Sequence, residues 1–301
     1  MSDSLIVSVI AAEGVTRIAD VVRKITRDFK SSGTVGAPVW LSPDRACDIP
    51  VSFASPELAE ILPRGFVHAG EGVDVNVLSP AHRRKKLLVA DMDSTIINVE
   101  CLDELADMAH LKPQISAITE RAMNGEIAFE PALRERVGLL KGLSISALER
   151  TYKERVRLNP GAKALVATMK KHGARTCLVS GGFTYFTERV AKDAGFEDSQ
   201  ANILLDDGNR LTGEVKEPIL GREAKLVALK AEIEKLKITT EESLAVGDGA
   251  NDLAMIHHAG LGVAYHAKAI VADAASAAIR YGDLRALLYL QGYSDAEIVE
   301  A

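Results

Sequence analysis

The sequence predicts an α/β protein with a doubly wound parallel sheet, preceded by a smaller α+β domain. Three observations support this prediction. Short apolar runs recur after residue 82, each near a segment that can form a helix, as in alternating βα units. The first of them, Leu87–Ala90, is apolar throughout, which is typical of a strand covered by helices on both faces. The first 82 residues instead mix short extended and helical segments, which indicates a separate domain.

The N-terminal residues are predicted to have the element order βαββαβ, in which two βαβ halves form a small sheet. The expected strands are residues 5–11, 38–41, 49–53 and 73–78, and the expected helices are residues 15–29 and 56–62. Ser79-Pro80 marks the exit, and the basic run 83–86 after it is expected to be a solvated linker. We therefore place a boundary near residue 82, which gives domains 1–82 and 83–301.

Further apolar runs predict the core of the second domain. The expected strands are residues 87–90, 176–179, 243–246 and 261–264, and the expected helices are residues 162–171, 186–194, 223–236 and 252–259. Residues 100–157 contain no comparable strand and are broken at Pro113, Gly125 and Gly142. This segment is therefore predicted to be a helical insertion that covers the sheet.

The composition is that of a globular protein. Of 301 residues, 47% are hydrophobic, and 36 basic against 42 acidic side chains give a formal net charge of −6. The acidic balance argues against binding to nucleic acid, which needs clustered Lys and Arg. Cys47, Cys101 and Cys177 are odd in number and lack C-x-x-C spacing, so neither a disulfide framework nor a zinc site is expected.

We expect no secretory signal at the N-terminus, because residues 1–4 carry no positive side chain and the apolar run 5–12 is short. No stretch approaches the roughly 18 to 20 apolar residues that span a bilayer. We therefore expect a cytoplasmic protein that does not interact with membranes.

Two carboxylates follow the strand Leu87–Ala90. Asp91 and Asp93 lie two residues apart, so an extended backbone places them on the same side, at the strand end where open α/β sheets bind ligands. Such carboxylates repel each other unless a cation lies between them or one keeps its proton. A hard cation such as Mg²⁺, shared with a substrate phosphate, fits this pattern. The alternative is a solvated turn.

Two other strand ends carry polar or glycine-rich sequences. Residues 247–252, Gly-Asp-Gly-Ala-Asn-Asp, follow the strand 243–246, and the alternative to a metal site there is a turn capped by Asp252. Ser180-Gly181-Gly182 forms an expected loop before a helix, which offers a hydroxyl and backbone N–H groups to a phosphate. Lys225 could neutralise a phosphoryl oxygen or be a solvated helix residue.

The order D-x-D-S-T, S-G-G, Lys and G-D-G-x-N-D resembles the haloacid dehalogenase superfamily and, within it, the phosphoserine phosphatases. The resemblance covers residues 86 to about 281. It implies a HAD-like Rossmannoid core with a helical cap at about residues 100–157. It also implies Mg²⁺-dependent hydrolysis of O-phosphoserine to serine and phosphate through an aspartyl-phosphate, the last step of serine biosynthesis.

The resemblance also implies roles for particular residues. Asp91 would be the nucleophile, and Asp93 would protonate the leaving oxygen and later activate water. Mg²⁺ would be held by Asp91, the backbone carbonyl of Asp93 and Asp248. The phosphate would be bound by Ser180, Gly181 and Lys225, with support from Asn251 and Asp252.

Serine recognition is assigned to the insertion. Glu100 would pair with the substrate ammonium group and Arg136 with its carboxylate, while Met123 and Phe129 line the pocket. From the residues alone, Arg136 in Arg134-Glu135-Arg136 reads as a surface helix residue.

The N-terminal element order is similar to that of ACT or ferredoxin-like modules. Amino-acid sensing or homodimerisation is the functional interpretation, and a passive appendage is the alternative. Two other functions stay open. One is a phosphatase or phosphotransferase of the same fold for another small phosphoester, and the other is a serine-binding sensor with an idle α/β domain.

Overall fold

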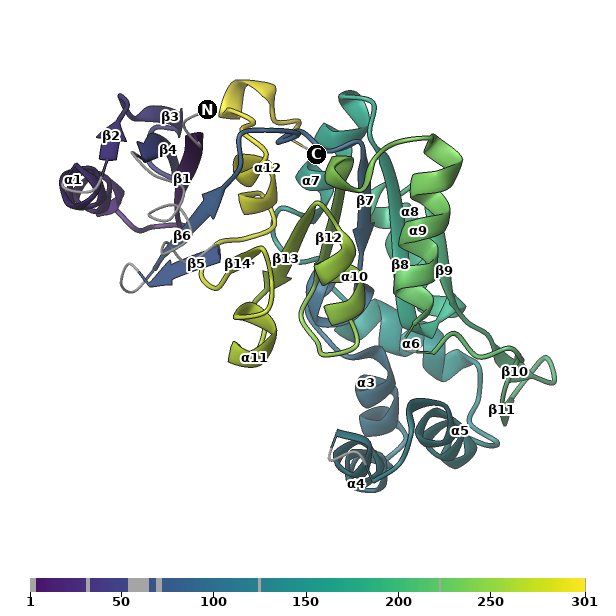
Figure 1. Cartoon of the computed structure of the whole chain (residues 1–301). Coiled ribbons are helices and arrows are strands. Elements are labelled where there is room, and N and C mark those ends of the chain that lie inside the picture. The colour runs from purple at the N-terminus through teal and green to yellow at the C-terminus, as the bar shows by residue number, and fades with distance from the viewer. Residues whose placement is uncertain are drawn as a thin grey trace. The chain divides into compact units, whose positions relative to one another are not determined.

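The structure is a computed structural model that describes residues 4–30, 33–53, 65–68, 72–123, 126–221 and 223–300, with the backbone alone at 53, 65–68 and 123. The chain divides into two compact units. The first comprises Met1–Val89, Pro160–Thr176 and Leu229–Ala301, and the second comprises Ala90–Asn159 and Cys177–Ala228. The boundary predicted near residue 82 is a different division and stays a prediction. Figure 1 labels the helices and strands.

The N-terminal region of the first unit is an antiparallel sheet with a helix packed against it. Its described elements are β1 (Ser4–Ala11), α1 (Ile18–Phe29), β2 (Gly33–Val35), β3 (Val39–Ser42), β4 (Ala46–Phe53), β5 (Gly65–His68) and β6 (Val73–Leu78). The strand order is β2-β4-β1-β6-β5, and β3 pairs with β4. The apolar face of α1, including Ile18 and Val22, packs on alternate residues of β1 such as Val7 and Val9.

The strands expected at 5–11, 38–41, 49–53 and 73–78 are confirmed. The expected helix 15–29 begins later, at Ile18, because Gly14, with a φ of +80°, forms a turn before it. Strands β2 and β5 were not predicted, and the helix expected at 56–62 lies outside the described residues.

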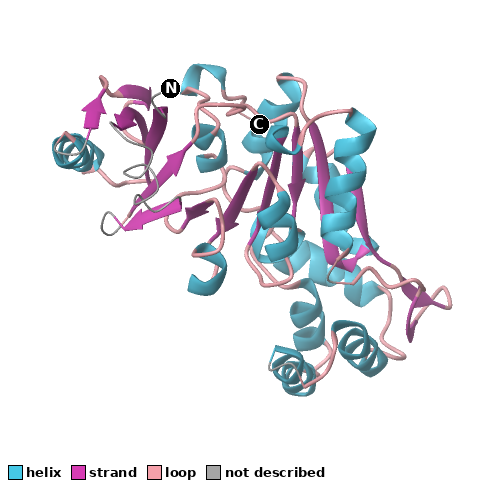
Figure 2. Cartoon of the chain, in the orientation of Figure 1, coloured by secondary structure: helices cyan, strands magenta, loops and turns pink. Residues whose placement is uncertain are grey.

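A second large sheet has the strand order β14-β13-β12-β7-β8-β9. Its strands are β7 (Leu87–Ala90), β8 (Arg175–Phe183), β9 (Asp198–Asn202), β12 (Ser243–Gly247), β13 (Leu261–Tyr265) and β14 (Ala277–Ile279), shown in magenta in Figure 2. The pairs β12–β13, β13–β14 and β8–β9 are parallel. Helices between or after these strands are α7 (Ala162–Lys171), α8 (Thr184–Ala194), α9 (Ala224–Leu236), α10 (Leu253–His258), α11 (Ala269–Ala272) and α12 (Ala286–Leu290). The predicted parallel α/β fold is therefore confirmed.

Three strands of this sheet begin side by side. The Lys86 N–H, just before β7, donates to the Glu242 carbonyl, just before β12, at 2.7 Å. The Arg175 N–H at the start of β8 donates to the Lys86 carbonyl at 2.9 Å. Because all three strands leave the same edge, their carboxyl ends are directed toward the opposite edge.

The sequence predicted that the basic run before β7 is a solvated linker, which is correct only for the exposed Arg84 and Lys86. Arg83 donates to both carboxylate oxygens of Asp48, at 2.5 and 2.9 Å, and to the carbonyls of Tyr289 and Leu290. Lys85 is 7% exposed, and its Nζ donates to the Glu241 carbonyl at 2.6 Å. Burial lowers the pKa of Lys85 to about 8. The prediction failed at residues 83 and 85 because a run of basic residues in the sequence does not show which carbonyl and carboxylate acceptors the folded chain brings next to it.

Side chains of β6 cap the edge strand β14. The Asn76 amide donates to the Ala278 carbonyl at 3.1 Å and accepts from the Ala278 N–H at 2.8 Å. The Asp74 carboxylate, 0% exposed, accepts the backbone N–H groups of residues 280, 281 and 282 at 2.8 to 3.1 Å. These bonds satisfy backbone groups that an edge strand would otherwise leave open.

The second unit contains the predicted helical insertion. Its described residues form α3 (Cys101–Met108), α4 (Lys112–Met123), α5 (Phe129–Leu139) and α6 (Ser146–Arg155), with no strand among them (Figure 2). Pro113 lies in the first turn of α4, where a helix needs no N–H, so it starts a helix instead of breaking one. A hairpin of β10 (Leu204–Asp206) and β11 (Leu211–Val215) contacts α5. None of the helices in the described ranges combines the length and apolar character needed to cross a membrane.

Replacing Asp74 by Ala should lower the free energy of unfolding by about 3 kcal/mol, because three backbone N–H groups lose their buried acceptor. Chemical denaturation of both proteins measures the difference. Asp20→Ala is the control, since the exposed Asp20 pairs only with exposed Arg23 among the contacts described, and should cost less than about 1 kcal/mol. Equal effects of both substitutions would contradict the role of Asp74.

Candidate active site

The strand β7 leads into a buried ion pair. Asp91 follows the strand with an extended backbone, at φ −69° and ψ 157°, and is 5% exposed. Lys225, in the first turn of α9, is 4% exposed, and its Nζ lies 2.7 Å from Asp91 Oδ1. The solvated alternative for Lys225 is therefore wrong. Each of these charges would be costly to bury alone, so the two side chains depend on each other.

Asp93 has both carboxylate oxygens hydrogen-bonded. The Cys101 N–H donates to Oδ1 at 2.9 Å, and the Ser180 hydroxyl donates to Oδ2 at 3.2 Å. Burial raises the pKa of the Asp93 carboxyl, while these hydrogen bonds and the charge of Lys225 lower it in part. A carboxyl group with a raised pKa keeps its proton at higher pH, which suits general acid catalysis.

The turn that carries Asp93 also holds Glu100. Ser94 in this turn has a φ of +54°, a left-handed conformation that is strained for a residue with a side chain. Its hydroxyl donates to Glu100 Oε1 at 2.6 Å. Glu100 is exposed and directly precedes α3. The exposed carboxylate is therefore tied to the turn between the strand and the helical insertion.

The predicted phosphate-binding loop is part of a strand. The expectation that the strand ends at residue 179 was wrong, because β8 continues to Phe183 and α8 begins at Thr184. The pairing of β8 with β9 is irregular between Val179 and Phe183, so Ser180 lies at a bulge. Glycines in a bulge interrupt an apolar run just as a loop does, which is why the pattern indicated a loop.

Both glycines of this bulge allow close approach of neighbouring side chains. A Cβ on Gly182 would lie 3.0 Å from Asp93 Oδ2 and equally close to Ser180 Oγ. A Cβ on Gly181 would lie 3.3 Å from the Phe129 ring. The Gly182 N–H donates to the Ser180 hydroxyl at 2.8 Å. The bulge thus presents a hydroxyl and backbone N–H groups beside a carboxyl group, in space that a larger residue would fill.

The acidic loop after β12 belongs to the first unit. Asp252 is 0% exposed, and its Oδ2 accepts the Gly249 N–H at 3.0 Å. A Cβ on Gly247 would lie 2.3 Å from the Asp252 carboxyl carbon. A Cβ on Gly249 would lie 2.3 Å from Asn251 Oδ1. The glycines let both side chains fold back on the loop that carries the partly exposed Asp248.

Arg136 of α5 is half-buried within the insertion. Its Nε donates to the Ala132 carbonyl at 3.3 Å, and Nη1 donates to the Thr119 hydroxyl at 3.5 Å. Burial lowers the pKa of Arg136, whereas the negative charges of Asp103 and Glu100 act against this. No carboxylate of the described residues lies within ion-pair distance of its guanidinium group. Arg136 is therefore not the surface helix residue that the sequence alone suggested.

Most predicted residues of the second unit lie in contact with another member of the set. The contacting pairs are Asp91 with Lys225 and Asp93 with Ser180, and the Phe129 ring lies beside Gly181, 3.3 Å from where a Cβ would be. Glu100 and Arg136 lie within electrostatic reach of each other. The side chain of Met123, which ends α4, lies outside the described part of the chain.

The sequence did not identify Cys101 and Asp103 as members of the site. Cys101 is the first residue of α3, and free N–H groups at a helix start are suited to bind a carboxylate, so its position was a usable signal. The charge of Asp103 reaches Arg136 only through the folding of the helical insertion, for which the sequence gives no local sign.

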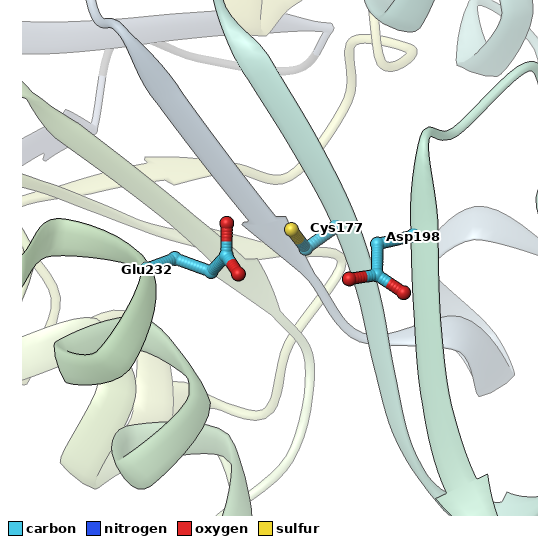
Figure 3. A group of neighbouring side chains, drawn as sticks. All are labelled: Cys177, Asp198 and Glu232. Atoms are coloured by element: carbon cyan, nitrogen blue, oxygen red, sulfur yellow. The ribbon is translucent and has the colours of Figure 1, made fainter. Parts of the chain in front are cut away.

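Figure 3 draws another group of polar side chains, Cys177, Asp198 and Glu232. Cys177 of β8 and Asp198 of β9 are register partners in the parallel pair. The Glu232 carboxylate, on α9, accepts hydrogen bonds from Arg175 at 3.3 Å and Lys235 at 2.9 Å. Two cations therefore already neutralise Glu232, and we assign no ligand to this group.

The sequence pattern of the haloacid dehalogenase-like hydrolases matches residues 88–257. The chain is 46% identical over 226 residues to a phosphoserine phosphatase of Polaromonas sp. strain JS666, which covers 73% of this chain and 96% of that protein. A HAD family hydrolase from Salmonella enterica serovar Typhi has a similar structure, with a TM-score of 0.84, 28% identity, and coverage of 97% of this chain and 99% of that one. A phospho-aspartyl intermediate analogue of phosphoserine phosphatase has a TM-score of 0.63 and 38% identity, and covers 68% of this chain and 98% of that one.

Proposed function

The chain belongs to the haloacid dehalogenase-like hydrolase family, and from that membership we propose that it is a phosphoserine phosphatase. It hydrolyses O-phosphoserine to serine and phosphate, the last step of serine biosynthesis. The observation that carries the proposal is the buried pair of Asp91 and Lys225, with Asp93 two residues away in a different environment. Two carboxyl groups in such different surroundings suit a nucleophile and a proton donor.

The reaction proceeds in two displacements. A carboxylate oxygen of Asp91 attacks phosphorus while the bond from phosphorus to the serine oxygen breaks, and Asp93 donates its proton to that oxygen. Asp93, now ionised, then takes a proton from a water molecule. That water attacks phosphorus, and the bond to Asp91 breaks, which releases phosphate and restores both carboxyl groups.

Ser180, Gly181 and Lys225 hold the phosphoryl group in this scheme. The Lys225 ammonium group beside Asp91 is within reach of any oxygen attached to the phosphorus under attack. The Ser180 hydroxyl and the bulged backbone around Gly181 supply hydrogen-bond donors next to Asp93. Before substrate arrives, the Ser180 hydroxyl donates to Asp93, so it has to rotate toward the phosphoryl oxygens when substrate binds.

A divalent cation, Mg²⁺, would be held by Asp91, Asp248 and the backbone carbonyl of Asp93. These donors are all oxygen atoms, the ligand type that a hard cation prefers. The shared starting edge of β7 and β12 supports this assignment, because their carboxyl ends then lead toward one edge of the sheet. When bound, Mg²⁺ neutralises negative charge on the phosphoryl oxygens. Asp252 and Asn251 support the loop that carries Asp248.

Substrate recognition lies in the helical insertion. The half-buried guanidinium group of Arg136 binds the serine carboxylate, and Glu100 binds the ammonium group. Phe129, which contacts Gly181, and Met123 line the space between these charges and the phosphate. A zwitterionic amino acid fits this separation of charges. A phosphatase for another small phosphoester is the alternative, which these two charged residues disfavour.

We assign residues 1–82 to an ACT-like or ferredoxin-like module and residues 83–301 to the phosphatase. The central position of β1 between β4 and β6 supports the first assignment. Homodimerisation or amino-acid sensing is its proposed role, and a sensor with an idle catalytic domain is disfavoured by the complete set of catalytic residues. We place the protein in the cytoplasm.

Asp91→Asn should reduce phosphate release from O-phosphoserine at least about a thousandfold, because the amide cannot form the aspartyl-phosphate. A colorimetric phosphate assay measures the rate, and circular dichroism with thermal unfolding checks that the variant is folded. A folded variant with near-normal turnover would exclude the covalent mechanism.

A panel of phosphorylated amino acids and sugars should show the highest kcat/KM for O-phosphoserine. Chelation with EDTA should abolish turnover of every substrate, and excess Mg²⁺ should restore it, since the oxygen donors alone leave the phosphoryl charge uncompensated. Activity that survives exhaustive chelation would contradict the metal assignment, and equal rates across the panel would contradict the substrate assignment.

Arg136→Ala should lower kcat/KM for O-phosphoserine by about thirtyfold or more, the effect of losing a charged hydrogen-bonded pair. Turnover of p-nitrophenyl phosphate, which has no carboxylate, should change less than about threefold. Arg134→Ala is the matched control on the same helix, because Arg134 is exposed and pairs with Glu217. Equal losses on both substrates would remove Arg136 from substrate recognition.

A further inference from the structure

Asn202, the last residue of β9, is 2% exposed and binds the backbone of two separate segments. Its Nδ2 donates to the Gly181 carbonyl at 2.9 Å and to the Leu220 carbonyl at 3.3 Å. Its Oδ1 accepts the Leu220 N–H at 2.7 Å. Both N–H donors and the carbonyl acceptor of one amide side chain are therefore used to hold these two segments together.

Each of these segments carries a group assigned to phosphate binding. Gly181 lies in the bulge of β8, directly after Ser180, whose hydroxyl donates to Asp93. Leu220 lies in the segment between β11 and α9, five positions before Lys225 in the sequence. Asn202 thus connects the backbone that presents hydroxyl and N–H donors with the backbone that leads to the ammonium group.

The bulge in β8 explains why an amide is needed at this position. Asn202 is the register partner of Phe183, where regular pairing between the strands resumes after the irregular stretch. Within the bulge, the Gly181 carbonyl accepts a hydrogen bond from the Asn202 side chain. Only an amide of this length offers two N–H donors and a carbonyl acceptor; an ionised carboxylate offers no donor, and a hydroxyl offers one.

We propose that Asn202 is a positioning residue that fixes the distance between the bulge at Gly181 and the segment leading to Lys225, so that both match one phosphoryl group. The proposal rests on the proposed function and deepens it. Charge on the phosphoryl oxygens is spread differently in the transition state than in the bound substrate, so a small misplacement affects the chemical step most.

Asn202→Asp is the most direct test, because the change is nearly isosteric. Above the pKa of the new carboxyl group, a carboxylate would face the carbonyls of Gly181 and Leu220 without a donor. We expect kcat to fall about tenfold to a hundredfold, the cost of a displacement of about 1 Å, and KM to change less than about threefold. The fall should be the same for O-phosphoserine and p-nitrophenyl phosphate, because both use the same phosphoryl-binding groups.

The pH profile gives a second readout. Burial raises the pKa of a carboxyl group at residue 202, and the protonated form regains one O–H donor while keeping its acceptor. The ratio of variant to wild-type kcat should therefore rise as pH falls from 8 to 5.5. Because Asp93 is present in both proteins, dividing the kcat of the variant by that of the wild type at each pH cancels the contribution of its titration to the profile.

Asn76→Asp is the matched control. Asn76 is also fully buried and also binds backbone N–H and C=O groups, those of Ala278 in β14, but it belongs to neither phosphate-binding segment. This variant should lose stability to thermal unfolding without a change in kcat, in KM or in the shape of the pH profile.

A folded Asn202→Asp variant with wild-type kcat and pH profile would overturn the proposal, as would a loss confined to O-phosphoserine. If this variant does not fold, Asn202→Ala replaces it. That variant is purified in saturating inorganic phosphate to stabilise it and is assayed after the phosphate is removed, and the same loss of kcat is expected. Failure of both variants to fold would show that Asn202 supports the whole fold and would also overturn the proposal. Wild-type protein that hydrolyses p-nitrophenyl phosphate but not O-phosphoserine would refute the proposed substrate alone, and the kcat comparison would still test Asn202.

Discussion

The ion pair between Asp91 and Lys225 is the interaction on which the second unit depends. Each charge is almost inaccessible to water, and burying it would be costly without the opposite charge beside it. Since Asp91 is fixed at the end of β7, the first turn of α9 has to bring its ammonium group to that point. The bulge in β8 and the segment before α9 are constrained by the same requirement, through the hydrogen bonds of Asn202.

The same ion pair also gives different surroundings to two carboxyl groups, Asp91 and Asp93, that lie only two residues apart in the sequence. Asp91 faces a cation directly, whereas Asp93 lies in a setting whose burial raises its pKa. Identical side chains thus acquire different chemistry from their neighbours alone, and the contacts from Cys101 and Ser180 orient the second of them.

Strands and site residues that depend on a short stretch of sequence could be predicted. The apolar run Leu87–Ala90 and the carboxylates after it gave both the strand and the site, because strand burial and strand direction follow from local pattern. The bulge at Ser180 was taken for a loop, since glycines look alike in both. Asn202 and Asp103 had no local signal, because the hydrogen bond of Asn202 to Gly181 and the influence of Asp103 on Arg136 arise only in the folded chain. Edge strand β14 was missed because Ala277–Ile279 is too short to give a periodic pattern.

The linker between the N-terminal sheet and β7 is part of the folded structure. Arg83 donates hydrogen bonds to Asp48 of the sheet and to the carbonyls of residues 289 and 290 near the C-terminus. Its side chain thus connects the linker with two parts of the chain that are distant in sequence. A gene fusion that exchanged the N-terminal sheet for a foreign domain would leave this guanidinium group, which is 16% exposed, without its carboxylate partner. Residue 83 would therefore have to change together with the sheet that it contacts if the two were to stay compatible.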